Sequence, residues 1–461
     1  MSENCAVILA AGEGTRMKSE LPKALARVLF KPMLSWVADA VTGSGIDDLC
    51  IVAGYRHEKI EQYLNGAFPV VLQTERLGTG HAVKSAIDFI QAHSGGSVLV
   101  LAGDAPLVDS LTIAGALKEH TDKNNGVTVI SAILDDPHGY GRIVRDINGN
   151  IEKIVEEKDA TDNERTVKEI NSGAYWFRCS LLIDALLKLT NNNAKGEYYL
   201  TDTIRIIKAG GSNAGVFAAA SGDIVLGANT RLQLNELNEI ARKRELEAHM
   251  LAGVDIPCTD GVIIASGAVI GNDTLILPGT VIKGGVTIGS GCTVGPNTVL
   301  EDCSVGNDTV LNNVTARDSR IGNGVTAGPY VQLRPGTIVS DGVHIGNFVE
   351  VKNSSVGEGT KLPHLQYIGD ADVGKGVNIG CGCVTVNFTG RDKFRTTISD
   401  GAFIGCNTSL VAPVAVGRNA YTAAGSTITE DVPDDALAIA RSRQVNKEKW
   451  VVIKKPYRDN H

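Results

Sequence analysis

The sequence predicts an α/β domain with a mostly parallel, Rossmann-like sheet, followed by a parallel β-helix of hexapeptide repeats. In the first ~230 residues, Val/Ile/Leu-rich runs alternate with helical patterns, which is typical of parallel sheets covered by helices. From about residue 262 an aliphatic residue recurs every six positions, commonly followed by glycine. Among the 461 residues, 52 are glycine and only 5% are aromatic, which suits narrow coils with tight turns.

Five short apolar runs are the expected strands of the sheet, at residues 5–12, 48–55, 68–74, 97–104 and 126–134. Helical patterns lie between strands, at residues 33–45 and 81–93. Near-continuous apolar runs suit strands that are buried on both faces. Ligands of such sheets bind beyond the carboxyl ends of the strands, so we expect a site there.

The second half repeats pairs such as Ile288-Gly289 and Val294-Gly295. Neither a helix nor a simple strand has a period of six, whereas a coil of short strands with one inward aliphatic residue each does. Between the halves, Leu234 and Leu237 fall at helical spacing and Gly253 supplies a stop. The predicted division is a domain at 1–231, a linker helix at 232–252, and a β-helix domain with a basic tail at 253–461.

Charge and composition exclude several classes of protein. The formal charge of −8 gives no overall attraction to nucleic acid or to an anionic membrane. The N-terminal apolar run is too short for a signal peptide, and no segment approaches the ~18 apolar residues of a membrane span. The nine cysteines are dispersed without a C-x-x-C pair, which favours reduced thiols. We therefore expect a cytoplasmic protein with neither nucleic-acid nor membrane partners.

A glycine-rich loop follows the first expected strand. Gly12-x-Gly14 lacks the third glycine of a dinucleotide fingerprint and the Gly-Lys-Ser/Thr of a P-loop. Arg16 and Lys23 place two cations beside backbone amides that can reach a polyphosphate. Alone, the loop could equally be a tight turn without a ligand.

Two further features follow other strands of the sheet. Gln73 lies in a second glycine-rich loop and can read a base edge, while Asp104 ends the fourth strand as a single carboxylate. Such a carboxylate can bind Mg²⁺ when substrate phosphates complete the shell, although it could also cap a helix. Phosphoryl-type transfer needs mainly cations and an in-line arrangement.

The hexapeptide repeats carry a second group of polar residues within about three coils. They are Arg334, Glu350, Lys352, His364, Tyr367, Asn378 and Asn387. Residues 386–398 then break the count of six, as an extruded loop would. A histidine among two cations, a carboxylate and a tyrosine suits the removal of a proton from an amine, although a lone histidine is more often structural.

Residues 9–23 contain the pattern L-x-x-G-x-G-T-x-M and a Pro-Lys pair, which resembles the signature of sugar-nucleotide pyrophosphorylases. With the hexapeptide half, the whole chain resembles the bacterial family of bifunctional N-acetylglucosamine-1-phosphate uridyltransferases/glucosamine-1-phosphate acetyltransferases. The resemblance implies that the β-helix is left-handed. It also implies homotrimers with acetyl-transfer sites between subunits, and a tail that reaches a neighbour's acetyl-CoA.

For the first half, the resemblance implies uridylyl transfer from UTP to N-acetylglucosamine-1-phosphate with release of pyrophosphate. The residues expected to bind UTP or the product are Leu9, Ala10, Ala11, Gly12, Lys23, Gln73, Gly78, Thr79, Ala102, Gly103, Asp104, Gly141, Glu156, Asn171 and Asn229. Within this set Gln73, Gly78 and Thr79 would hold the uracil, and Gly141, Glu156 and Asn171 the N-acetylglucosamine. Asp104 and Asn229 would hold Mg²⁺. Arg16 and Lys23 would steady the phosphates.

For the second half, the resemblance implies acetyl transfer from acetyl-CoA to glucosamine-1-phosphate. His364 matches the general base, and Glu350 would orient and polarise it. The expected sugar-phosphate ligands are Arg334, Lys352, Tyr367 and Asn378. The expected acetyl-CoA ligands are Cys381, Asn387, Phe388, Cys406, Ala424 and Arg441.

Three positions depart from the family pattern, which more often has Tyr at Phe388, Asp at Thr389 and Ser at Cys406. The missing hydroxyl at 388 is expected to weaken contacts with the cofactor or the sugar. Cys406 cannot supply a hydroxyl, whereas a backbone amide near it could still stabilise an oxyanion. Two alternatives stay open. One is a single-activity sugar-nucleotide pyrophosphorylase whose β-helix only oligomerises or binds regulators. The other is a non-catalytic subunit with the same folds, which would be expected to lose Asp104, Lys23 or Arg16.

Overall fold

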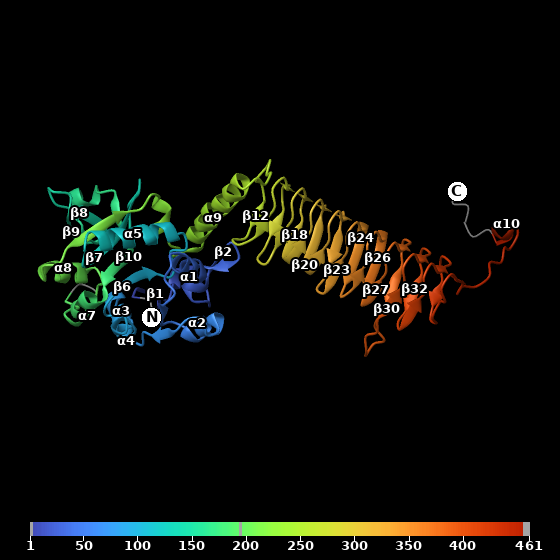
Figure 1. The fold of residues 1–461 in the computed structure, drawn as a ribbon, viewed down its shortest axis with the longest axis horizontal. Coiled ribbons are helices and arrows are strands. Elements are labelled where there is room, and N and C mark those ends of the chain that lie inside the picture. The colour runs from blue at the N-terminus through green and yellow to red at the C-terminus, as the bar shows by residue number, and fades with distance from the viewer. Residues whose placement is uncertain (1–2, 193–195, 455–461) are drawn as a thin grey trace. The chain divides into compact units, whose positions relative to one another are not determined.

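The structure is a computed structural model that describes residues 3–192 and 196–454. The chain divides into two compact units, Met1–Arg244 and Glu245–His461 (Figure 1). The division falls inside helix α9 (Arg231–Leu251). The domain boundaries predicted from the sequence flank this helix and stay predictions.

The N-terminal unit contains the five strands that the sequence predicts. They are β1 (Cys5–Ala10), β4 (Leu49–Ala53), β5 (Val70–Leu72), β6 (Ser97–Ala102) and β7 (Val127–Ile133). β1 pairs in parallel with β4 and with β6, and β4 pairs in parallel with β5. The carboxyl ends of these strands consequently lie at one edge of the sheet.

Four further strands complete this sheet. They are β8 (Arg142–Arg145), β9 (Ile151–Val155), β10 (Glu169–Arg178) and β11 (Ala214–Ala218). β10 lies antiparallel between β6 and β7, so the sheet is mixed although most strands run the same way. β8 and β9 form an antiparallel hairpin joined to β10. A separate two-stranded ribbon pairs β2 (Arg27–Val28) with β3 (Lys31–Pro32).

Helices cover both faces of the sheet. One core contains apolar side chains of α1 (Met33–Gly43), α2 (His57–Leu64) and α5 (Ser110–Asp122). The other contains those of α3 (Thr79–Ser85), α4 (Ile87–Gln91), α7 (Cys179–Leu187) and α8 (Asp202–Ala209). The helix expected at 81–93 is thus two helices that meet at Ala86. Short helical turns are η1 (Thr15–Met17), η2 (Lys23–Leu25), α6 (Asp162–Arg165) and η3 (Gly222–Val225).

The C-terminal unit is a parallel β-helix of short strands (Figure 1). Its first strands are β12 (Ile263–Ile264), β13 (Val269–Ile270), β14 (Leu275–Ile276), β15 (Val281–Ile282), β16 (Thr287–Ile288), β17 (Thr293–Val294), β18 (Val299–Val305), β19 (Val310–Leu311), β20 (Val314–Ile321) and β21 (Thr326–Ala327). The strands that carry the predicted acetyl-transfer residues follow, namely β22 (Val331–Leu333), β23 (Thr337–Val339), β24 (His344–Lys352), β25 (Ser355–Val356), β26 (Lys361–Gly369), β27 (Ala371–Val373), β28 (Asn378–Ile379) and β29 (Val384–Val386). The last are β30 (Thr396–Ile398), β31 (Phe403–Ile404), β32 (Ser409–Val411), β33 (Val414–Val416), β34 (Tyr421–Thr422), β35 (Thr427–Ile428) and β36 (Leu437–Ala438), before the short helix α10 (Trp450–Lys454).

Three hexapeptides make one coil of the β-helix. Ile263 pairs with Val281, eighteen residues later, and each strand stacks on an equivalent strand of the next coil. The repeating aliphatic residues, such as Ile264, Ile276 and Ile282, are fully buried and form one continuous core. The period of six is thereby explained, because each short strand contributes its side chain to the same interior.

The glycine that follows many aliphatic residues makes room for a hydrogen-bond ladder along one corner. The side-chain oxygens of Asn307, Asn323 and Asp341 accept the backbone N–H groups of Ser290, Asn307 and Asn323, at 2.9, 2.8 and 2.7 Å respectively. A Cβ on Gly306 would come within 2.6 Å of Asn323 Oδ1. A side chain there would break the ladder, so the glycine is a requirement of stacking.

All nine cysteines are free thiols. Most are buried, Cys381 is half-buried, and Cys258 and Cys406 are exposed. Within residues 3–192 and 196–454, no helix has both the length and the apolar character needed to cross a bilayer.

Candidate functional site

A cavity of about 1120 Å³ opens at the carboxyl ends of β1, β5 and β6. The predicted residues that line it are Leu9, Ala11, Gly12, Arg16, Gln73, Gly78, Thr79, Ala102, Asp104 and Glu156. A volume of this size accommodates a large organic ligand. The parallel strands thus bring together side chains that are far apart in the sequence.

The glycine-rich loop at 12–14 leaves its backbone accessible. A Cβ on Gly12 would meet nothing within 4 Å, whereas one on Gly14 would come within 2.7 Å of the Cβ of Lys23. Gly14 also has a φ of +66°, in the left-handed region. The close approach at Gly14 lets Lys23 pass directly behind the loop.

Lys23 joins Asp104 and Asn229. Its Nζ lies 2.7 Å from Asn229 Oδ1 and forms an ion pair with Asp104 Oδ2. Two hard oxygen donors therefore converge on one positive charge, which is the donor chemistry that suits Mg²⁺ together with substrate phosphates. Asp104 is no helix cap, because Asp109 caps α5 by accepting the N–H of Thr112 at 2.7 Å.

In the part of the cavity where the uracil is expected, Gln73 is almost fully buried. Its Nε2 donates to the carbonyl of Gly78 at 3.2 Å and lies 3.2 Å from His81 Nδ1. Gly78 has a φ of +100°, and a Cβ there would come within 2.7 Å of the carbonyl of Tyr198. Thr79 Oγ1 accepts the N–H of Leu200 at 3.1 Å. The loop is therefore held rigidly against residues 198–200.

Gly141, Glu156 and Asn171 form another cluster. The N–H of Asn171 donates to the carbonyl of Gly141 at 2.8 Å, and a Cβ on Gly141 would be 3.6 Å from Glu156 Oε1. Asn171 Nδ2 donates to the hydroxyl of Tyr175 at 2.7 Å, and burial raises the pKa of Tyr175. Tyr175 therefore stays protonated and holds the amide in place.

Some predicted residues lie near this cavity without lining it, namely Ala10, Lys23, Gly103, Gly141, Asn171 and Asn229. Other lining residues were missed by the sequence reasoning, namely Arg76, Ala82, His138, Gly139, Glu157, Lys158, Asp159, Glu197 and Tyr199. Arg76 pairs with Glu13 of the glycine-rich loop, and its guanidinium lies 5.7 Å from the ring of Tyr55. The only signal for Arg76 was its place in the same loop as Gln73.

The second group of polar residues lies on successive coils of the β-helix. Register places Gln332, Glu350 and Tyr367 in one column, and Asn347 and His364 in another. Arg334 Nη1 donates to Glu350 Oε1 at 2.7 Å. Arg334, Glu350, His364 and Tyr367 are thereby gathered on neighbouring coils.

That Glu350 orients His364 stays a prediction, and the structure of the single chain shows a different partner for each of the two side chains. Among the described residues, the side-chain partner of His364 is Asn347, whose Oδ1 lies 3.3 Å from Nδ1, while Glu350 pairs with Arg334. The reason is register, because Asn347 lies directly beneath His364. If Nδ1 donates to this oxygen, Nε2 has a lone pair that can take a proton.

The expected acetyl-CoA ligands lie on later coils of the same stack. A Cβ on Gly380 would come within 2.6 Å of the amide nitrogen of Cys406, and one on Gly405 within 2.6 Å of that of Ala424. A Cβ on Gly425 would be 3.8 Å from Arg441 Cδ. Cys406, Ala424 and Arg441 therefore form a column, one coil apart.

The remaining expected ligands lie in the same coils. Asn378 begins β28, and its N–H donates to the carbonyl of Ala402 at 3.1 Å. Cys381 accepts the N–H of Asn407 at 2.7 Å through its carbonyl. Asn387 is buried, whereas Phe388 is 54% exposed. Of the basic tail at 442–461, residues 455–461 lie outside the described residues.

Comparison with known proteins matches each half to a family. Residues 5–222 match the nucleotidyl transferase family. Residues 267–302 and 318–353 match the bacterial transferase hexapeptide family of six repeats, which is consistent with the left-handed β-helix predicted from the sequence.

Curated relatives match over almost the whole length of the chain. A protein of Geobacillus sp. (strain WCH70) is 50% identical over 451 residues, covering 98% of both chains, and is named bifunctional protein GlmU. Proteins of the same name from Caldanaerobacter subterraneus subsp. tengcongensis and Clostridioides difficile are 48% and 46% identical over 98% and 97% of this chain, and over 98% and 97% of their own length.

Proposed function

Because the chain belongs to the bifunctional GlmU family, we propose that its two units use the residues gathered above for two consecutive reactions. The protein is an enzyme with uridyltransferase and acetyltransferase activities, of the kind associated with cell-wall synthesis. Acetyl transfer from acetyl-CoA to glucosamine-1-phosphate yields N-acetylglucosamine-1-phosphate. Uridylyl transfer from UTP then yields UDP-N-acetylglucosamine and pyrophosphate.

We propose the cavity at the carboxyl ends of β1, β5 and β6 as the uridylyl-transfer site. The loop at 12–14, with Arg16 and Lys23, receives the triphosphate. Gln73 and its loop receive the uracil, and the cluster around Glu156 receives the sugar. A phosphate oxygen of the sugar phosphate attacks the α-phosphorus, and the bond to the pyrophosphate oxygen breaks. Lys23 and Arg16 offset the negative charge that moves onto pyrophosphate.

Asp104 and Asn229 would hold Mg²⁺. The observation that supports this assignment is the convergence of their oxygens on the ammonium of Lys23. A bound Mg²⁺ supplies positive charge to the phosphates. Lys23, which contacts both residues, lies beside the loop at 12–14 that is proposed to receive the triphosphate.

We propose the coils around His364 as the acetyl-transfer site. Nε2 of His364 takes a proton from the amine of glucosamine-1-phosphate, and the amine nitrogen attacks the thioester carbonyl carbon. The C–S bond breaks and coenzyme A leaves as its thiol. Asn347 keeps the ring in the required tautomer because its Oδ1 accepts a hydrogen bond from the N–H group at Nδ1.

The substrate ligands of this reaction lie around that histidine. Arg334 and Lys352 face the sugar phosphate, with Tyr367 and Asn378 beside them. Cys381, Asn387, Phe388, Cys406, Ala424 and Arg441 bind acetyl-CoA. The main support is that the stack gathers these residues within a few coils.

We also propose a homotrimer, and its support is an exposed apolar stripe formed by Tyr330, Phe348 and Leu365. All three have a positive φ, of +62°, +58° and +30°, and are 57%, 54% and 60% exposed. Placing bulky residues in the left-handed region costs about 1–2 kcal/mol each, so their exposure calls for a partner. Phe348 and Leu365 directly follow Asn347 and His364, so a second copy covering the stripe would also border the acetyl-transfer site.

One assay tests the whole proposal. The protein is incubated with glucosamine-1-phosphate, acetyl-CoA, UTP and Mg²⁺, and the products are identified by mass. UDP-N-acetylglucosamine and free coenzyme A are expected. Omission of acetyl-CoA should stop the sequence unless N-acetylglucosamine-1-phosphate is added. Failure of that addition to restore the nucleotide sugar would contradict the assignment of the first site.

A further inference from the structure

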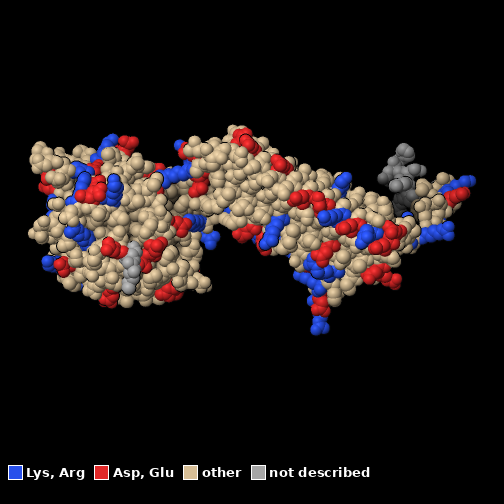
Figure 2. Space-filling view, in the orientation of Figure 1, with Lys and Arg blue, Asp and Glu red and all other residues tan. Residues whose placement is uncertain are grey.

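The loop of residues 387–395 interrupts the β-helix between β29 and β30. Asn378 pairs with Phe403, twenty-five residues later, whereas Ile263 pairs with Val281 after eighteen residues and Asn347 with His364 after seventeen. The loop projects from the stack in Figure 1, and Figure 2 shows charged side chains at the end of the projection. Asn387, at its start, is a proposed acetyl-CoA ligand, so the placement of this loop bears on the second reaction.

The first end of the loop is held by Asp370. Asn387 Nδ2 donates to Asp370 Oδ2, and Asn353 Nδ2 donates to Asp370 Oδ1 at 2.5 Å. Asp370 and Asn387 are only 6% and 7% exposed. Two amides therefore donate to the two oxygens of one buried carboxylate.

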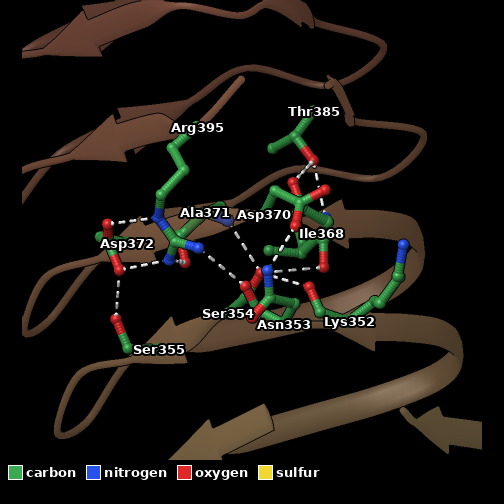
Figure 3. Close-up of polar contacts among 11 residues, drawn as sticks. Lys352, Asn353, Ser354, Ser355, Ile368, Asp370, Ala371, Asp372, Thr385 and Arg395 are labelled. Carbon is green, nitrogen blue, oxygen red and sulfur yellow. Dashed lines mark hydrogen bonds and ion pairs between the residues drawn. The ribbon is translucent and has the colours of Figure 1, made fainter. Parts of the chain in front are cut away.

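The second end of the loop is held by Asp372. Arg395 donates to both of its carboxylate oxygens, at 2.9 and 2.6 Å, and also to the carbonyl oxygens of Asn353 and Ala371 (Figure 3). Asp370 and Asp372 lie two residues apart, on either side of Ala371. One short segment thus anchors both ends of the loop.

The chemistry of Asp370 determines which way the Asn387 amide faces. A carboxylate only accepts hydrogen bonds, so the NH₂ group of Asn387 must face Asp370. The same Nδ2 lies 3.5 Å from the hydroxyl oxygen of Tyr367. The carbonyl oxygen of Asn387 is consequently turned away from both groups and is available as an acceptor.

We propose that Asp370 is a positioning residue for acetyl transfer, because it fixes the Asn387 amide with its carbonyl oxygen toward acetyl-CoA. That oxygen accepts an N–H of the ligand, such as an amide of its pantetheine arm. The inference rests on the proposed acetyl-transfer function. It adds that the orientation of Asn387, and with it the affinity for acetyl-CoA, depends on a carboxylate that itself contacts no substrate.

The charge state of Asp370 agrees with this role. Burial opposes its ionisation, but the hydrogen bonds from Asn353 and Asn387, together with the charges of Lys352 and Lys393, lower its pKa overall. Lys352 extends away from the Asn353–Asp370 pair in Figure 3, so it acts through its charge. Asp370 is therefore ionised at neutral pH and accepts both amides.

The experiment is the substitution Asp370→Asn in the full-length protein. The introduced amide has one acceptor oxygen and cannot satisfy both Asn353 and Asn387. We expect the KM for acetyl-CoA to rise about tenfold with a smaller change in kcat, as for one lost hydrogen bond to the ligand. Uridylyl transfer, measured on the same preparation with N-acetylglucosamine-1-phosphate, should be unchanged.

The double variant N353D/D370N provides the rescue. Its new carboxylate at position 353 accepts from the new amide at position 370, whose own oxygen again accepts from Asn387. The KM should therefore return to within about twofold of wild type. Asp341→Asn is the matched control, since Asp341 also accepts from an asparagine side chain, Asn323, elsewhere in the β-helix. Its KM for acetyl-CoA should not change.

The other possible results would refute either the positioning role of Asp370 or the proposed acetyl-transfer function. An unchanged KM in Asp370→Asn, or a lowered Tm and kcat with unchanged KM, would refute the positioning role. A double variant that regains Tm but not KM would refute it as well. If the wild-type protein transferred no acetyl group, the proposed function itself would be refuted. The wild-type assay alone therefore distinguishes this result from a failure of the positioning role.

Discussion

The two units build their sites in opposite ways. In the N-terminal unit, loops after parallel strands surround a cavity of about 1120 Å³, and Gln73 at its wall is buried. In the β-helix the candidate residues lie on the outside of a stack, and Phe348 and Leu365 beside them are 54% and 60% exposed. A sheet with connecting loops can enclose a ligand within one chain. The interior of a β-helix is filled by aliphatic side chains, so a ligand can bind only at its surface. In the homotrimer proposed above, a neighbouring copy would enclose the ligand.

The substitution with the largest expected effect is His364→Ala, which tests whether the two units carry separate sites. We expect acetyl transfer to fall by about 10²–10⁴-fold, as for the loss of a general base, while uridylyl transfer is unchanged. His344→Ala is the matched control, since His344 is also exposed on β24, where its Nδ1 lies 2.7 Å from Thr326 Oγ1. Coenzyme A release and nucleotide-sugar formation are measured separately. Undiminished acetyl transfer would remove His364 as the base.

The reverse separation is expected for Asp104→Ala. Loss of the carboxylate should lower uridylyl transfer by at least about 10²–10³-fold and leave acetyl transfer intact, since one electrostatic group at the phosphates is lost. Asp135→Ala, an exposed carboxylate paired with Lys168, serves as the control. Mg²⁺ titrations of both proteins show whether the metal requirement moves. A parallel loss of both activities would contradict two independent sites.

Acid should destabilise the α/β unit at a higher pH than the β-helix. Burial, followed by the charge of Arg178, lowers the pKa of His120 to about 4. The unfolded chain therefore binds this proton below about pH 6.5, and up to about 3 kcal/mol of stability is lost between pH 6.5 and 4. Urea unfolding followed by Trp176 fluorescence, the ring being 6.5 Å from His120, measures this loss. His120→Gln should flatten it, and an equally steep profile in that variant would contradict the assignment.

The β-helix should resist acid to a lower pH. Hydrogen bonds from Asn323 lower the pKa of Asp341, and those of Arg395 lower the pKa of Asp372. Stability from such groups is full above about pH 4 and is lost as the pH falls through their folded values. Circular dichroism at pH 5 should therefore show the α/β unit weakened before the β-helix. The opposite order would refute the comparison.

The smallest expected effect is that of Phe348→Ser. Removing one exposed ring from the apolar stripe should weaken self-association by about tenfold, roughly the transfer free energy of part of a phenyl ring. Acetyl transfer should then fall on dilution, whereas uridylyl transfer should not. Mass measured over a concentration series is the readout, with Leu111→Ser on α5 as the control. An unchanged mass would contradict the stripe as the interface.

How far the sequence predicts this molecule differs between the units. A period of six has one structural explanation, so the β-helix and its buried residues such as Ile276 follow directly. The strand order of the mixed sheet is harder to predict from the sequence, because β10 pairs antiparallel with its neighbours and its register with β7 shifts between Asn171 and Ala174. The β8–β9 hairpin does have a local signal in the sequence, the Asn148-Gly149 turn between two apolar runs.

The candidate sites show the same limit. Motifs identify residues that lie next to glycines or strand ends, such as Gly12 and Asp104. They do not identify partners set by register, and Asn347 is found only when His364 is counted back seventeen residues to the coil beneath it. Arg76 and Glu13, from two loops, meet only once the sheet is formed. Tertiary pairing carries this information, which local pattern does not.

The corner ladder of the β-helix gives the stack a direction. Each acceptor lies on the later coil and its backbone donor on the earlier one, as Asp341 does for Asn323. The backbone donors of one coil find their acceptors only when the next coil has folded. During synthesis, the last folded coil therefore always has unpaired backbone N–H groups at this corner. Fraying should begin at that coil and retreat by whole coils. Truncations made at coil boundaries should therefore yield shorter but regular proteins, whereas cuts within a coil should expose a ragged end.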